Sequence, residues 1–258
     1  MELGLTGRVV FVAGSSRGIG RGIAARFLAE GARVVVTGRD PAALAATAGE
    51  LAGTQAADRV LAVGGDLMTR AGIAAALTEV EKHWRFPDVV IANIGSGSSR
   101  PGWEVEPAEW ERLFAVNFWS SVYLAEAALP RLVAARSGSI VFISSIVGLE
   151  AVNAPLPYSA AKAALINYSK NLSRDVARHG VQVNCIAPGN IHFPGGSWDR
   201  KIQQDAGKVD AYLAAEVPLA RFGRPEEIGA LATFLCSPES GFVTGACLVA
   251  DGGQTRSL

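Results

Sequence analysis

Short runs of consecutive apolar residues, rich in valine and isoleucine, alternate along the chain with longer mixed segments. Such short runs are typical of strands that are buried on both faces. We expect strands at residues 8–13, 33–37, 60–63, 89–92, 139–144, 181–186 and 248–249. The longer segments predict helices at residues 21–30, from 41 onward, and at 69–84, 107–135 and 157–179. This alternation predicts an α/β fold with one parallel sheet and helices on both faces.

Residues 190–217 break the alternation. They carry three aromatic residues and a Pro-Gly-Gly sequence, and they mix loop with helix. Excursions of this kind from a compact α/β domain often form binding loops or lids. No internal repeat and no Pro/Ser-rich linker divides the chain. We therefore predict one domain over residues 1–258, with residues 190–217 as a lid that closes over the substrate.

A glycine-rich turn, Gly14-Ser15-Ser16-Arg17-Gly18-Ile19-Gly20, ends the first strand and opens the first helix. This is the context that a dinucleotide site requires, because the helix N-terminus attracts a pyrophosphate and glycine lets the backbone approach it. The turn lacks the Gly-Lys-Ser/Thr ending of a P-loop, which disfavours a nucleotide triphosphatase. The alternative is a turn that serves only tight packing of strand against helix.

The end of the second strand indicates which dinucleotide is preferred. An NAD site favours a carboxylate there, but this chain has Gly38 followed by Arg39. An arginine can hold a 2′-phosphate through charge-assisted hydrogen bonds, and Arg17 could join it. We therefore predict NADP(H) in preference to NAD(H), with solvated arginines as the alternative. Asp40 is interpreted as a helix cap and not as a ribose ligand.

Tyr158 and Lys162 lie four residues apart in a predicted helix, so both project from the same face. A nearby ammonium favours the phenolate and is expected to lower the pKa of Tyr158. The pair would then act as a general acid/base on a carbonyl or an alcohol. Taken alone, this spacing is a weak signal, because Tyr-x-x-x-Lys on a helix is usually a packed ring beside a solvated charge.

Composition narrows the function classes. Lys+Arg and Asp+Glu both number 24, so no basic excess indicates a nucleic-acid partner. No apolar run is long enough to span a bilayer, and no secretory signal is recognised, so we expect a cytoplasmic protein. The three cysteines are far apart in apolar segments and predict neither a disulfide nor a metal site.

The order of these motifs resembles the short-chain dehydrogenase/reductase family, in particular its members that reduce 3-oxoacyl thioesters on acyl-carrier protein. The resemblance extends from residue 8 to residue 253. It rests on the glycine turn together with Asp66-Leu67, Asn93-x-Gly95, Asn117, Ile143-Ser144-Ser145, Tyr158-x-x-x-Lys162, Pro188-Gly189 and Asp251-Gly252-Gly253.

The resemblance implies a Rossmann-type domain and hydride transfer between a nicotinamide and a carbonyl or secondary alcohol carbon. Tyr158 would be the acid/base, Lys162 would assist it and hold the nicotinamide ribose, and Ser145 would hold the substrate oxygen. Asn117 would position a water that relays protons to Lys162, or would simply tie neighbouring helices together. The cofactor-binding residues would be Gly14, Ser16, Arg17, Gly18, Ile19, Gly20, Arg39, Asp66, Leu67, Asn93, Gly95, Tyr158, Lys162, Pro188, Gly189 and Ile191.

Two motifs depart from the family pattern: Ala92-Asn93-Ile94-Gly95 stands in place of Asn-Asn-Ala-Gly, and the residues after Pro188-Gly189 differ. Ile94 stands where the family has alanine, and it is expected to alter packing below the cofactor. Phe193 stands where the family commonly has threonine, so a hydrogen bond to the cofactor is lost or supplied from elsewhere. Candidate substrate-pocket residues are Ser96, His192, Phe193 and Trp198.

The substrate class stays open between a 3-oxoacyl thioester and a sugar-type or other secondary-metabolite ketone. One alternative is an NAD-dependent dehydrogenase of polyols or sugar alcohols. Another is a protein that binds the cofactor as a sensor or scaffold without catalysis, although a sensor has no need of the proton relay. We expect a homodimer or homotetramer, a small-molecule partner, no nucleic acid, no membrane and no metal.

Overall fold

A parallel sheet organises the chain in the computed structural model, which describes residues 2–53, 56–100 and 102–256. The strand order is β3-β2-β1-β4-β5-β6-β7, so the direction of winding reverses between β1 and β4. This order confirms the predicted doubly wound α/β fold. The predicted domain also includes residues 1, 54–55, 101 and 257–258, which lie outside the described residues. The strands are β1 Val9–Val12, β2 Arg33–Gly38, β3 Val60–Gly64, β4 Val89–Ala92, β5 Gly138–Ile143, β6 Val181–Pro188 and β7 Cys247–Ala250.

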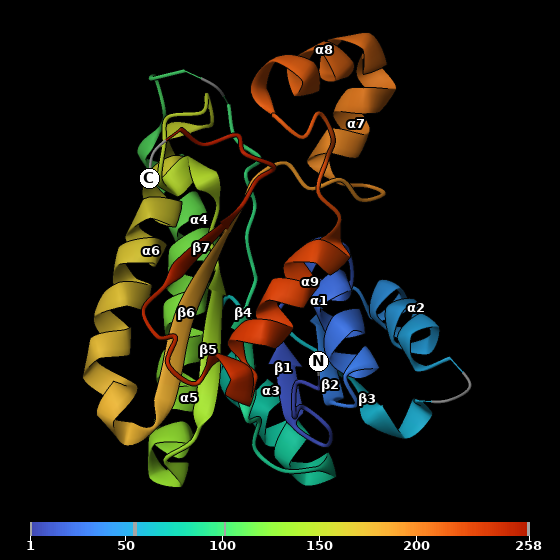
Figure 1. Cartoon of the computed structure of the whole chain (residues 1–258), viewed down its shortest axis with the longest axis vertical. Helices are drawn as coiled ribbons and strands as arrows, with labels where there is room; N and C mark the ends of the chain where they lie inside the picture. Colours follow the sequence, from blue (N-terminus) through green and yellow to red (C-terminus); the bar gives the residue numbers. More distant parts are fainter. Residues whose placement is uncertain (1, 54–55, 101, 257–258) are drawn as a thin grey trace.

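Helices cover both faces of this sheet (Figure 1). Helices α1, α2 and α9 pack on one face, and α3, α5 and α6 pack on the other. Successive residues of β1 face opposite layers: Val10 and Val12 contact the first layer, whereas Val9 and Phe11 contact the second. This is why β1 is apolar at every position. The helices are α1 Gly18–Ala29, α2 Pro41–Ala52, α3 Arg70–His83, α4 Pro107–Phe114, α5 Ser120–Ala135, α6 Leu156–Val176, α7 Ser197–Gln204, α8 Ala206–Glu216 and α9 Pro225–Leu235.

The predicted helix 107–135 is not uniform. Helices α4 and α5 are joined by a π-helical turn at Ala115–Trp119. Such a turn adds one residue to the helical repeat and is frequent at functional sites. Asn117, one of the predicted catalytic residues, lies inside this turn and is fully buried.

The predicted lid contains the helical hairpin α7–α8, which stands at the top of the molecule in Figure 1. The hairpin has a small core of its own. Val209, Leu213 and Val217 are buried there against Trp198 and Tyr212. The lid is therefore a packed unit and not an irregular loop.

Helix α9 was absent from the sequence-based prediction. It begins with Pro225 in its first turn, and the carboxylate of Glu227 accepts a hydrogen bond from the backbone N–H of Arg224 at 2.8 Å. It packs closely against α1, because a Cβ on Gly22 would lie 2.4 Å from Cβ of Pro225. Two helix backbones approach one another here only because a side chain is missing.

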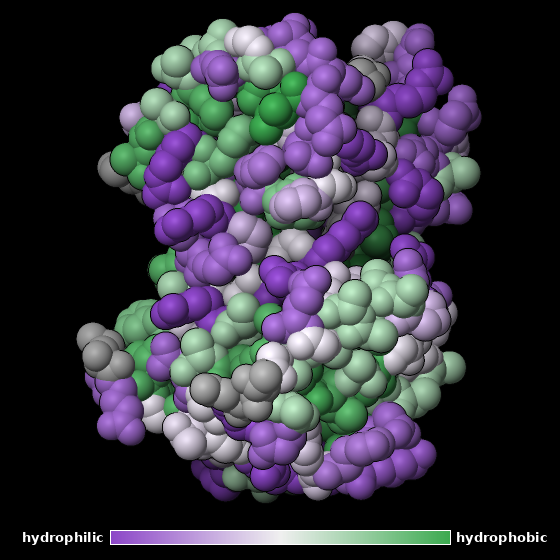
Figure 2. Space-filling view, turned by 90° about the vertical axis from the view of Figure 1, so that its right-hand side faces the viewer, coloured by the Kyte–Doolittle hydropathy of each residue, from purple (hydrophilic) through white to green (hydrophobic). Residues whose placement is uncertain are grey.

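The surface on the side seen in Figure 2 is mixed, with hydrophilic and hydrophobic residues interspersed over most of it. Hydrophilic residues gather in the narrower band between the upper and lower parts of this view. Among the described residues, no helix is long and apolar enough to cross a membrane.

The contact of α1 with α9 generates a stability prediction. Gly22→Ala should lower the free energy of unfolding by about 2 kcal/mol, because the new methyl group meets both Cβ and the carbonyl carbon of Pro225. Gly49→Ala in α2 is the matched control, since a Cβ at Gly49 has no neighbour within 4 Å. It should raise stability by about 0.5–1 kcal/mol. Urea unfolding of both variants measures this, and a Gly22→Ala protein as stable as wild type would contradict the packing described.

Candidate functional site

Tyr158 and Lys162 lie in the first two turns of α6, next to the carboxyl end of β5. Ser145 follows β5 and precedes the short 3-10 helix Ile146–Gly148. A hydrogen bond joins the side chains of Ser145 and Tyr158. Lys162 Nζ lies 5.9 Å from the centre of the Tyr158 ring. The structure thus brings together three of the four residues predicted to be catalytic.

Two hydrogen bonds fix Lys162 against the end of β5. Its Nζ donates to the carbonyl oxygen of Ile143 at 2.8 Å, and its own carbonyl oxygen accepts from Ser144 Oγ at 2.9 Å. The Ser144 hydroxyl donates to the backbone, whereas the Ser145 hydroxyl contacts Tyr158 as well as the carbonyl oxygen of Pro188 and the backbone N–H of Val147. Of the two adjacent serines, Ser145 is the one whose side chain reaches Tyr158.

Burial decides the electrostatics of the pair. It raises the pKa of Tyr158, and the hydrogen bond to Ser145 lowers that pKa to a smaller extent. Burial also lowers the pKa of Lys162 to about 8, because the ammonium is desolvated. The expected lowering of the Tyr158 pKa by Lys162 is thus not what the folded chain produces, because the net effect on this pKa is an increase. The loss of hydration around the phenol is the larger effect, and Tyr158 is a protonated donor near neutral pH.

Asn117 lies beside Lys162, with Gly95 between them. A Cβ on Gly95 would be 3.0 Å from Asn117 Oδ1 and 3.2 Å from Lys162 Nζ. The Asn117 side chain accepts from the backbone N–H of Ser96 and donates to the carbonyl oxygens of Ser96 and Leu113. Its amide group therefore holds the segment that follows β4 against the π-helical turn.

The glycine turn between β1 and α1 is shaped to receive an anion. Gly14 and Gly18 have φ of 68° and 59°, and a Cβ on Gly20 would lie 2.4 Å from the carbonyl oxygen of Gly14. Asn93 Nδ2 holds the turn by donating to the carbonyl oxygens of Ala13 and Gly14 at 3.2 and 3.0 Å. No side chain caps the start of α1, and uncapped N–H groups at a helix start are suited to bind an anion such as a pyrophosphate.

A model of the family described as enoyl-(acyl carrier protein) reductase matches residues 13–255. A 2-(S)-hydroxypropyl-CoM dehydrogenase of Xanthobacter autotrophicus is 31% identical, with 97% of this chain and 98% of the relative covered. The 3-oxoacyl-[acyl-carrier-protein] reductase of Aquifex aeolicus is 31% identical, with 98% and 100% covered. The crystal structure of L-sorbose reductase from Gluconobacter frateurii, complexed with NADPH and L-sorbose, is 30% identical with a TM-score of 0.93 and full coverage of both chains. The chain is a short-chain dehydrogenase/reductase.

In this short-chain dehydrogenase/reductase, no carboxylate stands at the end of β2. Gly38 occupies that place, where a Cβ would lie 3.0 Å from Cβ of Ser16. Asp40 instead accepts hydrogen bonds from the backbone N–H groups of Ala42 and Ala43, which confirms that it is a helix cap. Arg17, in the glycine turn, and Arg39, directly after Gly38, are both exposed. Guanidinium groups of this kind can bind a phosphate through charge-assisted hydrogen bonds.

The remaining predicted cofactor residues lie at the carboxyl ends of other strands. Leu67 is buried after β3, and Asp66 accepts a hydrogen bond from the backbone N–H of Met68. At the end of β6, a Cβ on Gly189 would lie 2.7 Å from Cβ of Asp251. Ile191 is buried and forms an isolated parallel bridge with a residue at the base of α9, Gly223.

Both departures from the family pattern make contact with the glycine turn. Ile94 packs under it, since a Cβ on Gly14 would lie 3.3 Å from Ile94 Cγ1. The ring of Phe193 lies directly on the turn, because a Cβ on Gly18 would be 2.7 Å from its Cζ atom. Sequence reasoning recognised that Phe193 is unusual, but the motif carries no information on where the ring points.

Three of the four candidate pocket residues, His192, Phe193 and Trp198, lie within residues 190–217, the predicted lid. Trp198 stacks on Tyr212 with ring centres 5.1 Å apart, and it lies 5.2 Å from Phe222 in the same small core. His192 Nε2 lies 3.4 Å from a carboxylate oxygen of Asp199. Ser96 contacts Asn117 through its backbone, and its hydroxyl accepts a hydrogen bond from the backbone N–H of Ser98.

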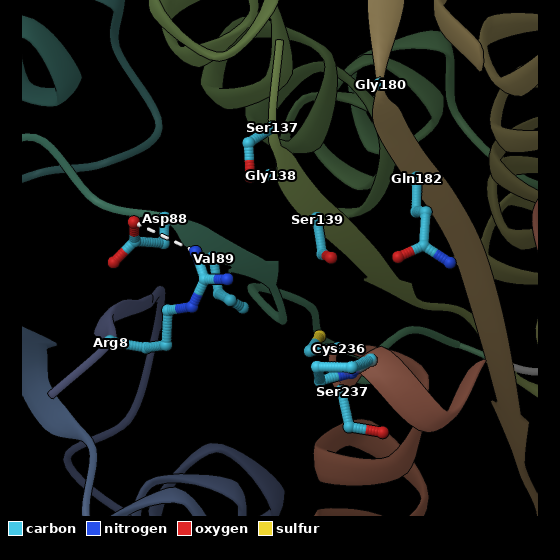
Figure 3. A pocket seen from close by; sticks show the side chains of 11 residues that line it. Arg8, Asp88, Val89, Ser137, Gly138, Ser139, Gly180, Gln182, Cys236 and Ser237 are labelled. Carbon is cyan, nitrogen blue, oxygen red and sulfur yellow. Dashed lines mark hydrogen bonds and ion pairs between the residues drawn. The ribbon is translucent and has the colours of Figure 1, made fainter. Parts of the chain in front are cut away.

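A separate cavity of about 110 Å³ lies at the amino ends of the strands, the opposite end of the sheet from Tyr158 (Figure 3). Its lining includes Arg8, Asp88, Ser139 and Gln182. Asp88 accepts a hydrogen bond from the backbone N–H of Val9 at 2.7 Å, so this carboxylate stabilises the start of β1. The three cysteines are free thiols, and the described residues contain no cluster of three metal-binding side chains.

The buried ammonium of Lys162 generates a pH prediction. Below pH 8 it is charged in the folded and unfolded states alike, so the folded protein carries the full cost of burying it. Between pH 8 and about 10.5 the folded state loses this proton first, so the stability that Lys162 costs is regained as pH rises. Lys162→Met should therefore be more stable than wild type at pH 7, by up to about 3 kcal/mol, and this difference should shrink across the window.

Unfolding by urea at pH 7, 8, 9 and 10 measures this difference. Lys170→Met is the matched control, because Lys170 lies on the same helix and also donates to a carbonyl oxygen, that of Gly245, but is exposed. Its stability relative to wild type should not change over the same range. A Lys162→Met difference that stays constant with pH would contradict the buried charge.

Proposed function

We propose that this chain is an NADP(H)-dependent oxidoreductase that transfers a hydride between the nicotinamide and a carbonyl or secondary alcohol carbon. The observation that carries the proposal is the segment that follows β4. Asn93 holds the glycine turn, and two residues later Gly95 lies against Lys162. The dinucleotide turn and the proton-transfer groups are thereby joined through three consecutive residues.

Each side chain has a distinct role in this proposal. The bound nicotinamide supplies or accepts the hydride. Ser145 donates a hydrogen bond to the substrate oxygen and steadies its developing negative charge. Tyr158 gives its phenolic proton to that oxygen, and the ammonium of Lys162 stabilises the phenolate that remains. Lys162 also holds the nicotinamide ribose, and Asn117 keeps the segment beside Lys162 in place.

The protonation states favour reduction near neutral pH. Because the pKa of Tyr158 is raised, the hydroxyl carries the proton that a ketone needs. Oxidation of an alcohol needs the phenolate, so it should require more alkaline conditions.

The substrate class in this proposal is a ketone on a 3-oxoacyl thioester or on a sugar-like molecule. Similarity to a 3-oxoacyl carrier-protein reductase supports the first, and similarity to L-sorbose reductase supports the second. Measuring NADPH oxidation with a panel of 3-oxoacyl thioesters and sugar-like ketones would distinguish the two substrate classes. Binding of NADPH without turnover of any compound would instead favour a cofactor sensor.

Removal of the phenolic hydroxyl tests the acid/base. Tyr158→Phe should lower kcat/KM for ketone reduction by about 10²- to 10⁴-fold, the contribution typical of a positioned general acid. Binding of NADPH, measured by its fluorescence, should be nearly unchanged. Tyr168→Phe is the matched control, because Tyr168 lies on the same helix and packs against Phe142. Full turnover in Tyr158→Phe would exclude this residue as the acid.

The preference for NADP(H) has its own test. Wild type should bind NADPH at least about tenfold more tightly than NADH, the value of one charge-assisted contact of about 1.5 kcal/mol or more. Arg39→Ala should remove most of that preference by weakening NADPH alone. Arg178→Ala is the control, since this exposed arginine precedes β6 at the other end of the sheet. Equal dissociation constants for the two cofactors in wild type would eliminate the phosphate contact.

A further inference from the structure

The ring of Phe193 fills the place that the missing side chain of Gly18 leaves open. A Cβ on Gly18 would lie 2.7, 2.8 and 3.0 Å from three atoms at the outer edge of this ring. Gly18 is the first residue of α1 and has φ of 59°, so the ring lies where the free N–H groups of the helix begin. In a dinucleotide turn, this is the surface that a pyrophosphate approaches.

The backbone around Phe193 keeps the ring in this position. The N–H of Gly196 donates to the carbonyl oxygen of Phe193 at 3.1 Å, which closes a turn through Pro194 and Gly195. Gly195 has φ of 72°, as the third residue of a type II turn requires. A Cβ on Gly196 would lie 3.1 Å from the Phe193 ring, so the ring is held between two glycines, Gly18 and Gly196.

The Phe193–Gly196 turn is hydrogen-bonded to helix α7 of the predicted lid. Asp199 Oδ2 accepts from the N–H of Gly195 at 2.8 Å, and Asp199 Oδ1 lies 3.4 Å from His192 Nε2. Asp199 belongs to α7, which packs in the separate small core of the lid. Movement of the lid as a unit would therefore carry the Phe193 ring away from Gly18.

We propose that Phe193 is a gate over the dinucleotide turn, whose ring must leave Gly18 before the pyrophosphate of a nicotinamide cofactor can bind. This inference rests on the proposed NADP(H)-dependent function and adds a residue that sets the cofactor affinity. The observed affinity is the intrinsic one reduced by the fraction of molecules with the gate open. Cofactor binding and displacement of the lid are then coupled.

Truncation of the ring tests the gate. Phe193→Ala should bind NADPH at least about fivefold more tightly than wild type, the lower range of such coupling. In stopped-flow experiments, the rate of NADPH binding to wild type should level off with concentration, because opening becomes limiting, whereas the rate for Phe193→Ala should rise linearly. Adenosine 2′-monophosphate, which has no pyrophosphate, should bind both proteins equally.

The controls separate the gate from the proposed function. Phe242→Ala removes a fully exposed phenylalanine near the amino end of the sheet and should bind NADPH as wild type does. Thermal unfolding of Phe193→Ala shows whether the fold is retained, and Phe193→Leu, which keeps an apolar side chain, should bind with intermediate affinity. Unchanged or weaker NADPH binding by Phe193→Ala overturns the gate while leaving the NADP(H)-dependent function standing. If wild type and variant both fail to bind NADPH, the gate and the proposed function fail together.

Discussion

The reciprocal pair of hydrogen bonds between Lys162 and the end of β5 determines where the reacting groups lie. One bond uses the side chain of Lys162 and the other uses its backbone, so the position of α6 and the direction of the ammonium are fixed together. Tyr158 lies one turn earlier on the same face and is placed by the same contact. The arrangement buries an ammonium, which costs stability and lowers the pKa of Lys162 to about 8. An apolar residue in place of Lys162 would avoid this cost, but it would place no positive charge beside the phenol of Tyr158.

Two glycines allow other segments to reach this buried lysine. Gly95 brings the end of β4 against Nζ, and Gly148 brings the turn after Ser145 against the backbone, where a Cβ would lie 2.7 Å from the carbonyl carbon of Lys162. Any larger side chain at either position would push its segment away from α6. The distances between Ser145, Tyr158 and Lys162 therefore depend on the absence of side chains at these two glycines as well as on the three residues themselves.

The strands and the order of the motifs could be predicted, because each depends on local pattern and spacing. The direction of the Tyr158 pKa could not, because it depends on how much water the folded chain excludes around the ring. Helix α9 was missed although Pro225 and Glu227 form a start signal, since its apolar residues do not stand out from the surrounding loop. The contact of Phe193 with Gly18 joins residues 175 positions apart, and no sequence pattern encodes such a direction for a ring.

The lid is organised differently from the rest of the chain. Its aromatic rings pack against one another, with Trp198 in contact with both Tyr212 and Phe222. The hairpin therefore does not depend on the main sheet for its packing. Tyr212 also receives hydrogen bonds from Asn190 and Gln254, which anchor the hairpin at its base. The hairpin thus has its own core and a polar anchor, whereas Phe193, near the start of the predicted lid, packs against the main core. In the proposed function the sheet positions the proton-transfer groups, and displacement of the predicted lid would open the dinucleotide turn at the cost of the contact between Phe193 and the main core.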